Sequence, residues 1–445
     1  MTSFSADWIL PISDAPLDGG VVTLDDGRIV SVAPGKSDAD VALGRAVVLP
    51  GLVNAHTHLE LSYLRGRIAP AARFLDWVRP MLAARRERSP IDDAAILRAV
   101  AQAIQEARAT GTALVGEVTN TLATVSALAD AGMPAHVFHE LIGFGGVDVD
   151  EQVASARRAI DAVAGGAVAD DAVAYDAVAY DAVAYDAVAY DAVAYDAIAE
   201  DQDIRLSLAP HAPYSVSPAL FAAIRRDLDA HAPTVSTVHL GESPEEVEFL
   251  KSGAGPWRTL LEDLGVWNDQ WEAPQSSPVE YLAEMGLLTA SMLAVHGVQF
   301  DGADLDRLRT LGVTLVSCPR SNRYVGVGSP PLEAFYAMDV EVAFGTDSLA
   351  SVDDLNMFSE LAEARRIAPK VPARTLLRSA TLTGAGALGF GDQFGSIEPG
   401  KRAALIAVRV PEGVSDVEEY LVSGIQPSAI QWLMSTPNSQ IPTSP

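Results

Sequence analysis

The chain has 445 residues, of which 49% are hydrophobic, and it carries a formal net charge of −28 at pH 7. This length suits an α/β barrel with one small additional domain, and the hydrophobic content excludes global disorder. The negative charge argues against binding to nucleic acid or to anionic membrane surfaces, because like charges repel.

Cysteine content and the first residues bear on the compartment. Cys318 is the single cysteine and cannot form an intramolecular disulfide, as is typical of a reducing cytoplasm. The opening MTSFSADWILPISDAP lacks the basic and apolar regions of a signal peptide, and no uninterrupted apolar run reaches the length of a bilayer span. We therefore expect a cytoplasmic protein that acts on a small molecule, with no nucleic-acid or membrane partner.

Both ends of the chain have the texture of short strands broken by turns. In GGVVTLDDGRIVSVAPG, β-branched residues alternate with Gly, Asp and Pro, and a similar pattern returns in FGSIEPGKRAALIAVRV. We expect residues 1–49 and 393–445 to form together a small β-sandwich domain.

Residues 50–392 alternate between helical and strand-like patterns. IDDAAILRAVAQAIQEARATG, for example, has helical apolar spacing and a terminal glycine. Eight apolar runs are typical of buried strands: AVVLPGLVNAH, TALVGEV, AHVFHELIGF, IRLSLAPH, TVSTVHLGE, MLAVHGVQF, VTLVSCP and VEVAFGTDS. Eight strands alternating with helices predict an α/β fold, namely a (β/α)8 TIM-like barrel.

A low-complexity segment interrupts this alternation. Residues 171–195 are five copies of DAVAY, a period that matches neither a helix stripe nor a strand face. Because alanine favours helix, we interpret the segment as a repeat expansion that lengthens a helix. A tyrosine-lined contact surface is the alternative.

Metal-binding side chains gather where the predicted strands end. His56 and His58 lie two residues apart on one strand, so both point to the same face, at the end of the barrel where active sites are built. Later strand ends carry His211, His239, His296 and Asp347. Three imidazoles and a carboxylate with one open position form a site for one divalent ion, Zn²⁺ or Fe²⁺.

The remaining polar candidates are less specific. Glu242 follows His239 in HLGE, where a carboxyl could move protons between water and a leaving nitrogen; the alternative is a surface glutamate. His136 and His231 lie at the edges of predicted elements, and we interpret both as surface residues.

The ordered motifs PGLVNAHTH, HLGE, VHGVQF, CPRSNRY and GTDSLAS resemble the amidohydrolase superfamily, in its mononuclear-metal deaminase and chlorohydrolase branch. The resemblance spans about residues 45–400 and implies a distorted barrel with a small β domain made from both termini. The metal ligands that it implies are His56, His58, His239 and Asp347. It makes Glu242 the proton shuttle, lets His296 and Asp347 orient the attacking hydroxide, and places His211 against the substrate.

Two other deaminase types are disfavoured. A dinuclear site with a carboxylated lysine needs a lysine on a central strand, and none lies in AHVFHELIGF or IRLSLAPH. The zinc deaminases with a PCxxC motif need a second cysteine.

Further segments, among them FLDWVRPM and CPRSNRYVGVG, resemble the aminodeoxyfutalosine deaminase group of menaquinone biosynthesis. That group implies an adenine nucleoside carrying a benzoate, whose carboxylate would need an arginine. The arginine candidates are Arg320 and Arg323, with Arg65 and Arg79 as further choices. Trp77 and Tyr214 could stack on adenine, although core packing explains such rings equally well.

Other functions remain open from the sequence. They are deamination of S-adenosylhomocysteine or methylthioadenosine, a triazine-type chlorohydrolase or aminohydrolase reaction, and a metal-free barrel that serves as a scaffold. The complete ligand set argues against the scaffold. A homodimer is the common expectation for an enzyme of this kind.

Overall fold

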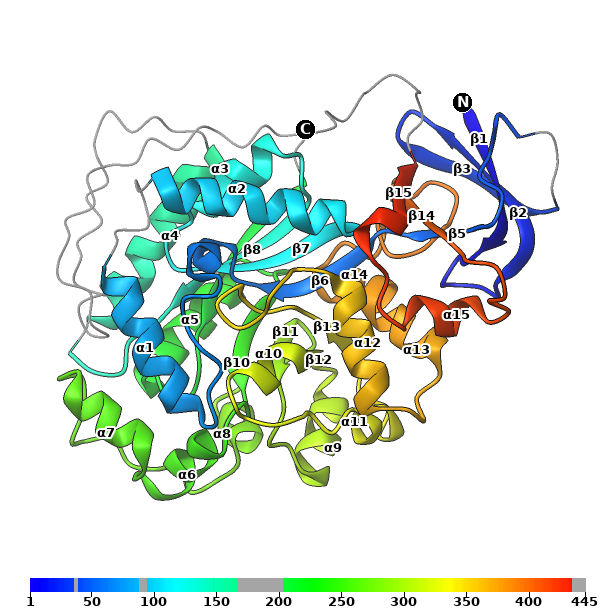
Figure 1. Cartoon of the computed structure of the whole chain (residues 1–445). Coiled ribbons are helices and arrows are strands. Elements are labelled where there is room, and N and C mark those ends of the chain that lie inside the picture. The colour runs from blue at the N-terminus through cyan, green and yellow to red at the C-terminus, as the bar shows by residue number, and fades with distance from the viewer. Residues whose placement is uncertain (36–38, 88–93, 147, 166–202, 434–445) are drawn as a thin grey trace. The chain divides into compact units, whose positions relative to one another are not determined.

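The computed structural model describes residues 1–35, 39–87, 94–146, 148–165 and 203–433 (Figure 1). The chain divides into two compact units, one of Met1–Val53, Ala107–Leu114 and Asn356–Pro445, the other of Asn54–Glu106 and Val115–Leu355. The first unit takes in more of the chain than the predicted small domain. The DAVAY repeat at 171–195 lies outside the described residues.

A mostly antiparallel sheet joins the two ends of the chain in the first unit. Its strands are β1 (Thr2–Ile9), β2 (Leu17–Asp25), β3 (Arg28–Pro34), β4 (Val41–Ala42), β5 (Ala46–Pro50), β14 (Leu405–Arg409) and β15 (Ile430–Leu433). The order is β15-β14-β5-β1-β2-β3, with β4 beside β1. Because β14 pairs with β5, both ends of the chain contribute to one sheet. Two facing sheets, as in a sandwich, stay a prediction.

The helices of the first unit follow residue 356. They are α12 (Met357–Ile367), α13 (Ala373–Arg378), the π-helix η4 (Ser379–Thr383), α14 (Gly384–Ala387), α15 (Val417–Leu421) and the 3-10 helix η5 (Pro427–Ala429). The side chain of Asn356 caps α12 by accepting from the N–H of Phe358.

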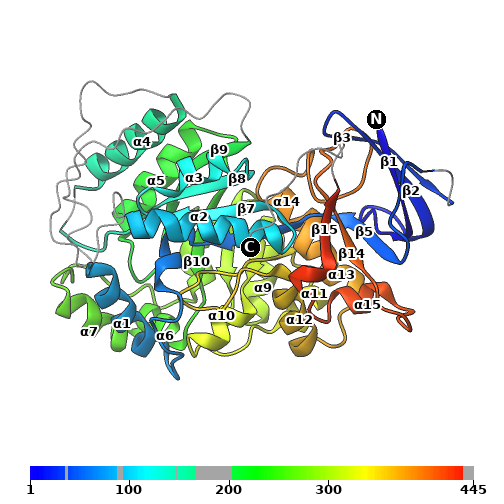
Figure 2. The same cartoon turned by 45° about the horizontal axis from the view of Figure 1, so that its top comes forward.

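The remaining strands form two four-stranded sheets. One contains β6 (Leu52–Thr57), β7 (Thr112–Thr119), β8 (Ala135–Leu141) and β9 (Ile204–Pro210); the other contains β10 (Ser236–Leu240), β11 (Met292–His296), β12 (Thr314–Ser317) and β13 (Val342–Phe344). From β7 to β9 and from β10 to β13 each neighbouring pair is parallel. Figure 2 shows β7, β8 and β9 side by side. All eight predicted apolar runs therefore contain a strand.

The first apolar run differs from its prediction because it forms two strands. Gly51 separates β5, which belongs to the large sheet, from β6. A Cβ on Gly51 would lie 2.6 Å from the Cβ of Ala113, so only glycine fits where the chain passes between the sheets.

Helices lie between most successive strands of the two smaller sheets. They are the 3-10 helix η1 (Leu59–Leu64), α1 (Phe74–Arg86), α2 (Ala94–Ala109), α3 (Thr124–Asp130), α4 (Val149–Gly165), α5 (Pro218–Ala230), α6 (Pro244–Ser252), α7 (Pro256–Asp263), α8 (Pro278–Glu284), α9 (Gly302–Leu311), α10 (Pro319–Tyr324) and α11 (Leu332–Ala337). Ser217, Ser243 and Ser277 each cap a helix that begins with proline. Within the described ranges, every helix is too short or too polar to cross a membrane.

Candidate metal and catalytic site

The histidines and the aspartate converge at the ends of the strands. His56 lies on β6 and His58 just after it, while His239 lies on β10 and His296 ends β11. The ring centroid of His56 is 4.9 Å from the ring centroid of His58 and also 4.9 Å from that of His239. The ring centroids of His58 and His239 are 5.4 Å apart. Donor atoms of His56, His58 and Asp347 all lie within 4.8 Å of one another.

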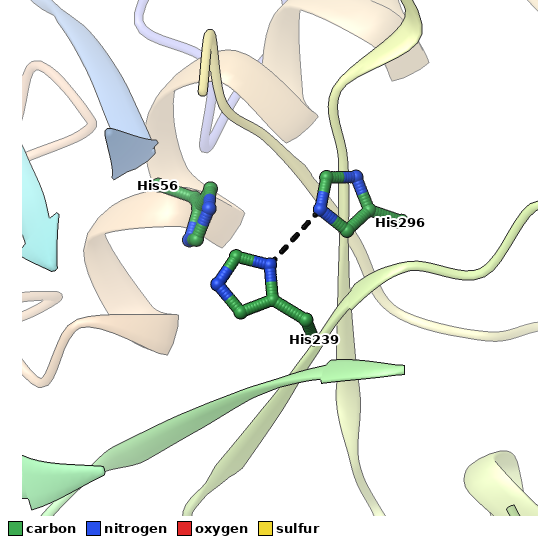
Figure 3. A group of neighbouring side chains, drawn as sticks. All are labelled: His56, His239 and His296. Atoms are coloured by element: carbon green, nitrogen blue, oxygen red, sulfur yellow. Dashed lines mark hydrogen bonds between the residues drawn. The ribbon is translucent and has the colours of Figure 1, made fainter. Parts of the chain in front are cut away.

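A hydrogen-bonded pair of imidazoles lies beside His56, as Figure 3 shows. Nδ1 of His239 is 3.1 Å from Nε2 of His296, whose Nδ1 lies 2.9 Å from the Oδ1 of Asn322. Both ring nitrogens of His56 are buried and have no hydrogen-bond partner among the described residues. Buried nitrogens rarely stay unpaired, so a metal ion fits the donor set.

The carboxylate of Asp347 faces this cluster. Its Oδ1 lies 3.5 Å from Nε2 of His58 and 3.9 Å from Nε2 of His56, and its Oδ2 accepts a 2.6 Å hydrogen bond from Ser321. Burial acts to raise the pKa of Asp347, but the surrounding imidazoles and the Ser321 hydroxyl outweigh it, and the pKa is lowered. The carboxylate is thus ionised, as a metal ligand must be.

The imidazoles of His56, His211 and His296 are held in their neutral form. Burial, reinforced by the neighbouring imidazoles, lowers the pKa of His56 well below its usual range. Burial also lowers the pKa of His296 to about 3 and that of His211 to about 4. Neutral imidazoles offer the lone pairs that a divalent cation needs.

Two residues of the site have a strained backbone. His296 (φ +79°) and Asp347 (φ +61°) adopt left-handed conformations, which cost of order 1–3 kcal/mol each for residues other than glycine. Tight packing accompanies this strain: a Cβ on Gly345 would lie 2.7 Å from both the Cβ and the carbonyl oxygen of His56. The end of β13 can therefore approach β6 only through a glycine.

Glu242 lies beside His296. Its side chain is 4% exposed, and its Oε1 is 3.7 Å from Nε2 of His296. Burial, followed by the charge of Asp347, raises the pKa of Glu242 well above its ordinary value. The alternative of a surface glutamate is wrong. The loop after β10, which carries Glu242, is held by Glu246. The Glu246 carboxylate accepts hydrogen bonds from the N–H groups of Gly241 (2.9 Å) and Glu242 (3.0 Å).

A second carboxylate that sequence analysis missed is Glu140, on β8. Its Oε1 lies 3.2 Å from Nε2 of His239, and it forms a further donor group with His211 and His239. Burial would raise the pKa of Glu140, but the imidazoles of His211 and His239 outweigh burial and lower it. The signal for it was a charged residue inside the apolar run AHVFHELIGF, at the same end as the predicted ligands.

A cavity opens in front of these groups, with an empty volume of about 950 Å³ that includes open solvent. Its polar lining consists mainly of His58, Arg85, Glu140, His211, Ser215, His239, Glu242, His296, Asp347 and Ser348. Trp77 and Tyr214 also line it, as their proposed contact with substrate requires.

The candidate arginines lie elsewhere. Arg320 donates to the Asp354 carboxylate at 2.7 Å, Arg79 pairs with Asp263 at 2.9 Å, and Arg65 pairs with Glu106 at 2.5 Å. Arg323 is exposed. The cavity lining includes none of these four arginines and contains Arg85 instead, whose Nη2 donates to Oδ1 of Asn120 at 2.9 Å. The arginine of the cavity lining is thus none of the four candidates, although Arg79 lies on the same helix, α1, as Arg85.

The two histidines interpreted as surface residues differ from each other. His231 is exposed at the end of α5, as predicted. His136 is 3% exposed on β8, and its Nε2 lies 2.9 Å from Oγ of Ser207, so its interpretation as a surface residue is wrong.

The chain is similar in sequence to known proteins. The chain is 29% identical over 350 residues to an aminodeoxyfutalosine deaminase of Deinococcus radiodurans, a match that covers 76% of this chain and 72% of that protein. It is also 29% identical over 408 residues to a 5-methylthioadenosine/S-adenosylhomocysteine deaminase of Syntrophobacter fumaroxidans, covering 88% of this chain and 80% of the relative.

The chain is also similar in fold to a solved structure. The adenosine deaminase of Xanthomonas campestris with bound zinc superimposes with a TM-score of 0.75 at 27% identity, over 96% of this chain and 90% of that one. The model of the amidohydrolase family matches residues 47–427. The resemblance drawn from the motifs is confirmed, and the chain is an enzyme of the amidohydrolase family.

Proposed function

We propose that the protein is a metal-dependent hydrolytic deaminase of an adenine-type nucleoside and that it releases ammonia. The observation that carries this proposal is that a buried acid and a hydrogen-bonded histidine lie beside two donor groups that share His56, next to a cavity. The participating residues are His56, His58, His239, Glu242, His296 and Asp347.

One divalent ion, Zn²⁺ or Fe²⁺, is proposed as the cofactor, with His56, His58, His239 and Asp347 as its ligands. Such an ion supplies Lewis acidity that brings the pKa of water from 15.7 toward about 7. The unpaired nitrogens of His56 and the neutral state of its imidazole support this ligand set.

The chain's own groups then direct the protons. Glu242 takes a proton from the attacking water and delivers it to the ring nitrogen beside the reacting carbon. A second transfer, from the newly added hydroxyl to the exocyclic amine, leaves a ring carbonyl as the C–N bond breaks and ammonia departs. His296, fixed through its Nδ1 by Asn322, orients the nucleophile together with Asp347. His211 contacts the substrate in this proposal, which is supported by the 4.9 Å distance between its ring centroid and that of His239.

The first choice of substrate is aminodeoxyfutalosine (6-amino-6-deoxyfutalosine), which belongs to menaquinone biosynthesis. The relative from Deinococcus radiodurans and the aromatic lining of the cavity, including Trp77, support it. Methylthioadenosine or S-adenosylhomocysteine is the second candidate, supported by an equally similar relative.

Glu242→Gln tests the reaction. Because Gln keeps the shape of the side chain but cannot carry the proton, we expect kcat to fall by about 10²- to 10⁴-fold with the metal content unchanged. Ammonia release from a panel of adenine nucleosides by metal-loaded protein is the measurement, and Glu248→Gln, an exposed position on α6, is the matched control. Near wild-type turnover in Glu242→Gln would refute the role of Glu242.

Several finer predictions belong to the same proposal. We propose that the two four-stranded sheets close into a (β/α)8 barrel, supported by the parallel bridge between Thr57 and Asp347 and by the hydrogen bond from the N–H of His239 to the carbonyl of His211. A small β-sandwich domain from residues 1–49 and 393–445, a homodimer, a cytoplasmic location and the lack of a nucleic-acid partner are likewise proposed from sequence.

A further inference from the structure

A chain of close polar contacts runs from α10 through two histidines to a carboxylate on β8. Oδ1 of Asn322 lies 2.9 Å from Nδ1 of His296, whose Nε2 lies 3.1 Å from Nδ1 of His239 (Figure 3). At the other end, Oε1 of Glu140 lies 3.2 Å from Nε2 of His239. All four residues are buried. Each hydrogen bond in such a chain needs one proton, so the groups at its two ends decide which ring nitrogens carry a proton.

The Asn322 end favours one direction of hydrogen bonding. An amide oxygen can only accept, so the ring of His296 carries its proton on Nδ1 and leaves Nε2 as an acceptor. This ring is neutral, because burial lowers the pKa of His296 to about 3. Nδ1 of His239 must then donate to Nε2 of His296. Nε2 of His239, which has no hydrogen-bond partner among the described residues, therefore keeps the lone pair that a metal ion requires.

The Glu140 end favours the opposite direction. Burial acts to raise the pKa of Glu140, but the imidazoles of His211 and His239 outweigh it and lower the pKa, so the carboxylate is ionised. An anionic oxygen 3.2 Å from Nε2 of His239 attracts the ring proton to that nitrogen. A proton there would occupy the lone pair that the metal needs. The charge of the ring is the same in both arrangements, which differ only in the nitrogen that holds the proton.

Two unfavourable features lie at the Asn322 end. His296 has the left-handed conformation described above (φ +79°), and Nδ2 of Asn322 is buried with no hydrogen-bond partner in the described part of the chain. An unpaired buried donor costs about 1–3 kcal/mol. Neither feature stabilises the fold, which indicates that the contact between Asn322 and His296 serves the site.

We propose that Asn322 is a positioning residue for the metal, because it fixes the ring protons of His296 and His239 on Nδ1. It thereby directs the lone pair at Nε2 of His239 to the ion and opposes the pull of Glu140. The proposal rests on the metal-binding part of the proposed function and is independent of the identity of the substrate.

The positions of the ring protons can be measured directly. In metal-free wild type labelled with ¹⁵N at its histidines, the protonated and unprotonated nitrogens of a neutral ring have distinct chemical shifts. We expect Nδ1 to be the protonated nitrogen in both His239 and His296, with assignments from His239→Asn and His296→Asn. A proton on Nε2 of His239 would overturn the proposal, and this measurement does not require any variant of Asn322 to fold.

Asn322→Leu removes the acceptor from the end of the chain. Because the proton of His239 then moves to Nε2, we expect the affinity for Zn²⁺ to fall by about 10- to 100-fold, as competition with a chelator would measure. Asn356→Leu, which replaces a buried asparagine that caps α12, is the matched control and should lose stability but keep its affinity for Zn²⁺. Equal affinity in Asn322→Leu and wild type would show that the amide does not position the metal ligand.

Glu140→Gln supplies a test that a merely structural role of Asn322 would not meet. Nδ2 of Asn120 donates to Oε2 of Glu140 at 3.0 Å, so a glutamine keeps its carbonyl toward Asn120 and turns its NH₂ toward His239. That NH₂ donates to Nε2 and favours the same ring protons as Asn322 does. We expect Asn322→Leu/Glu140→Gln to regain most of the lost affinity. A double variant as weak as Asn322→Leu would contradict the proposal, whereas a wild type that binds no stoichiometric metal would refute the proposed cofactor itself.

Discussion

At the scale of single residues, Glu246 shows how much the loop that carries Glu242 depends on a group outside the cavity lining. Its buried carboxylate accepts hydrogen bonds from the N–H of Gly241 and the N–H of Glu242. Burial raises its pKa to about 7, although those N–H groups act to lower it. A glutamine in its place keeps one carbonyl acceptor and sets an amide NH₂ against the other N–H.

We expect Glu246→Gln to lower kcat by about tenfold with little change in KM, because the side chain of Glu242 loses its fixed position while the cavity is unchanged. Glu248→Gln on the same helix should be neutral. Steady-state kinetics on the best substrate measure both variants. An equal loss in kcat and gain in KM would instead indicate a general disturbance of the cavity.

The same variant yields a prediction about pH. The pKa of Glu246 is about 7 in the folded state and ordinarily 4.5, so its ionisation is disfavoured by folding. Its contribution to stability is therefore present below pH 4.5 and is lost as the pH rises through about 7. The free energy of unfolding of wild type relative to Glu246→Gln should fall by about 3 kcal/mol across that window, as urea titrations at several pH values would measure. A constant difference would contradict the assigned pKa.

Residues differ in how well sequence alone could place them. His56, His58 and His239 could be predicted because strand alternation and strand ends fix where a side chain points. Arg85 and Trp257 could not, because helices α1 and α7 bring them to the cavity from positions that no local pattern marks. Arg320 lies outside the cavity lining for a similar reason: its partner, Asp354, is set by tertiary packing.

At the scale of elements, the proposed metal site depends on the close approach of β13 to β6. Gly345→Ala would place a Cβ against backbone atoms of His56 that cannot move independently of β6. We expect the variant to lose most of its bound metal and its activity while keeping its helical circular dichroism. Gly302→Ala, at a position with open space around it, is the matched control and should bind metal normally. Full metal occupancy in Gly345→Ala would show that β6 tolerates the shift.

Elements were easier to predict than their boundaries. β7 and β8 are buried along their whole length, so their apolar runs had no competing interpretation. The run from residue 46 to 56 was one pattern but two strands, because the break at Gly51 comes from the close approach of Ala113, a contact distant in sequence. Periodicity reports burial and does not report which sheet a strand joins.

At the scale of the whole molecule, the proposed metal joins segments nearly 300 residues apart in the chain. His56 and His58 lie at the end of β6, His239 on β10 and Asp347 after β13, so a bound ion ties the two four-stranded sheets together. An ion that binds only the folded state stabilises it by about 4 kcal/mol when its free concentration is a thousand times its Kd.

Removing the ion with a chelator should therefore lower Tm by several degrees, and adding Zn²⁺ back should restore it. Asp347→Asn, which removes a charged ligand, should begin with a lower Tm and respond little to the chelator. Thermal unfolding with parallel metal analysis measures both, and a Tm that does not change when stoichiometric metal is removed would exclude a structural contribution from the ion.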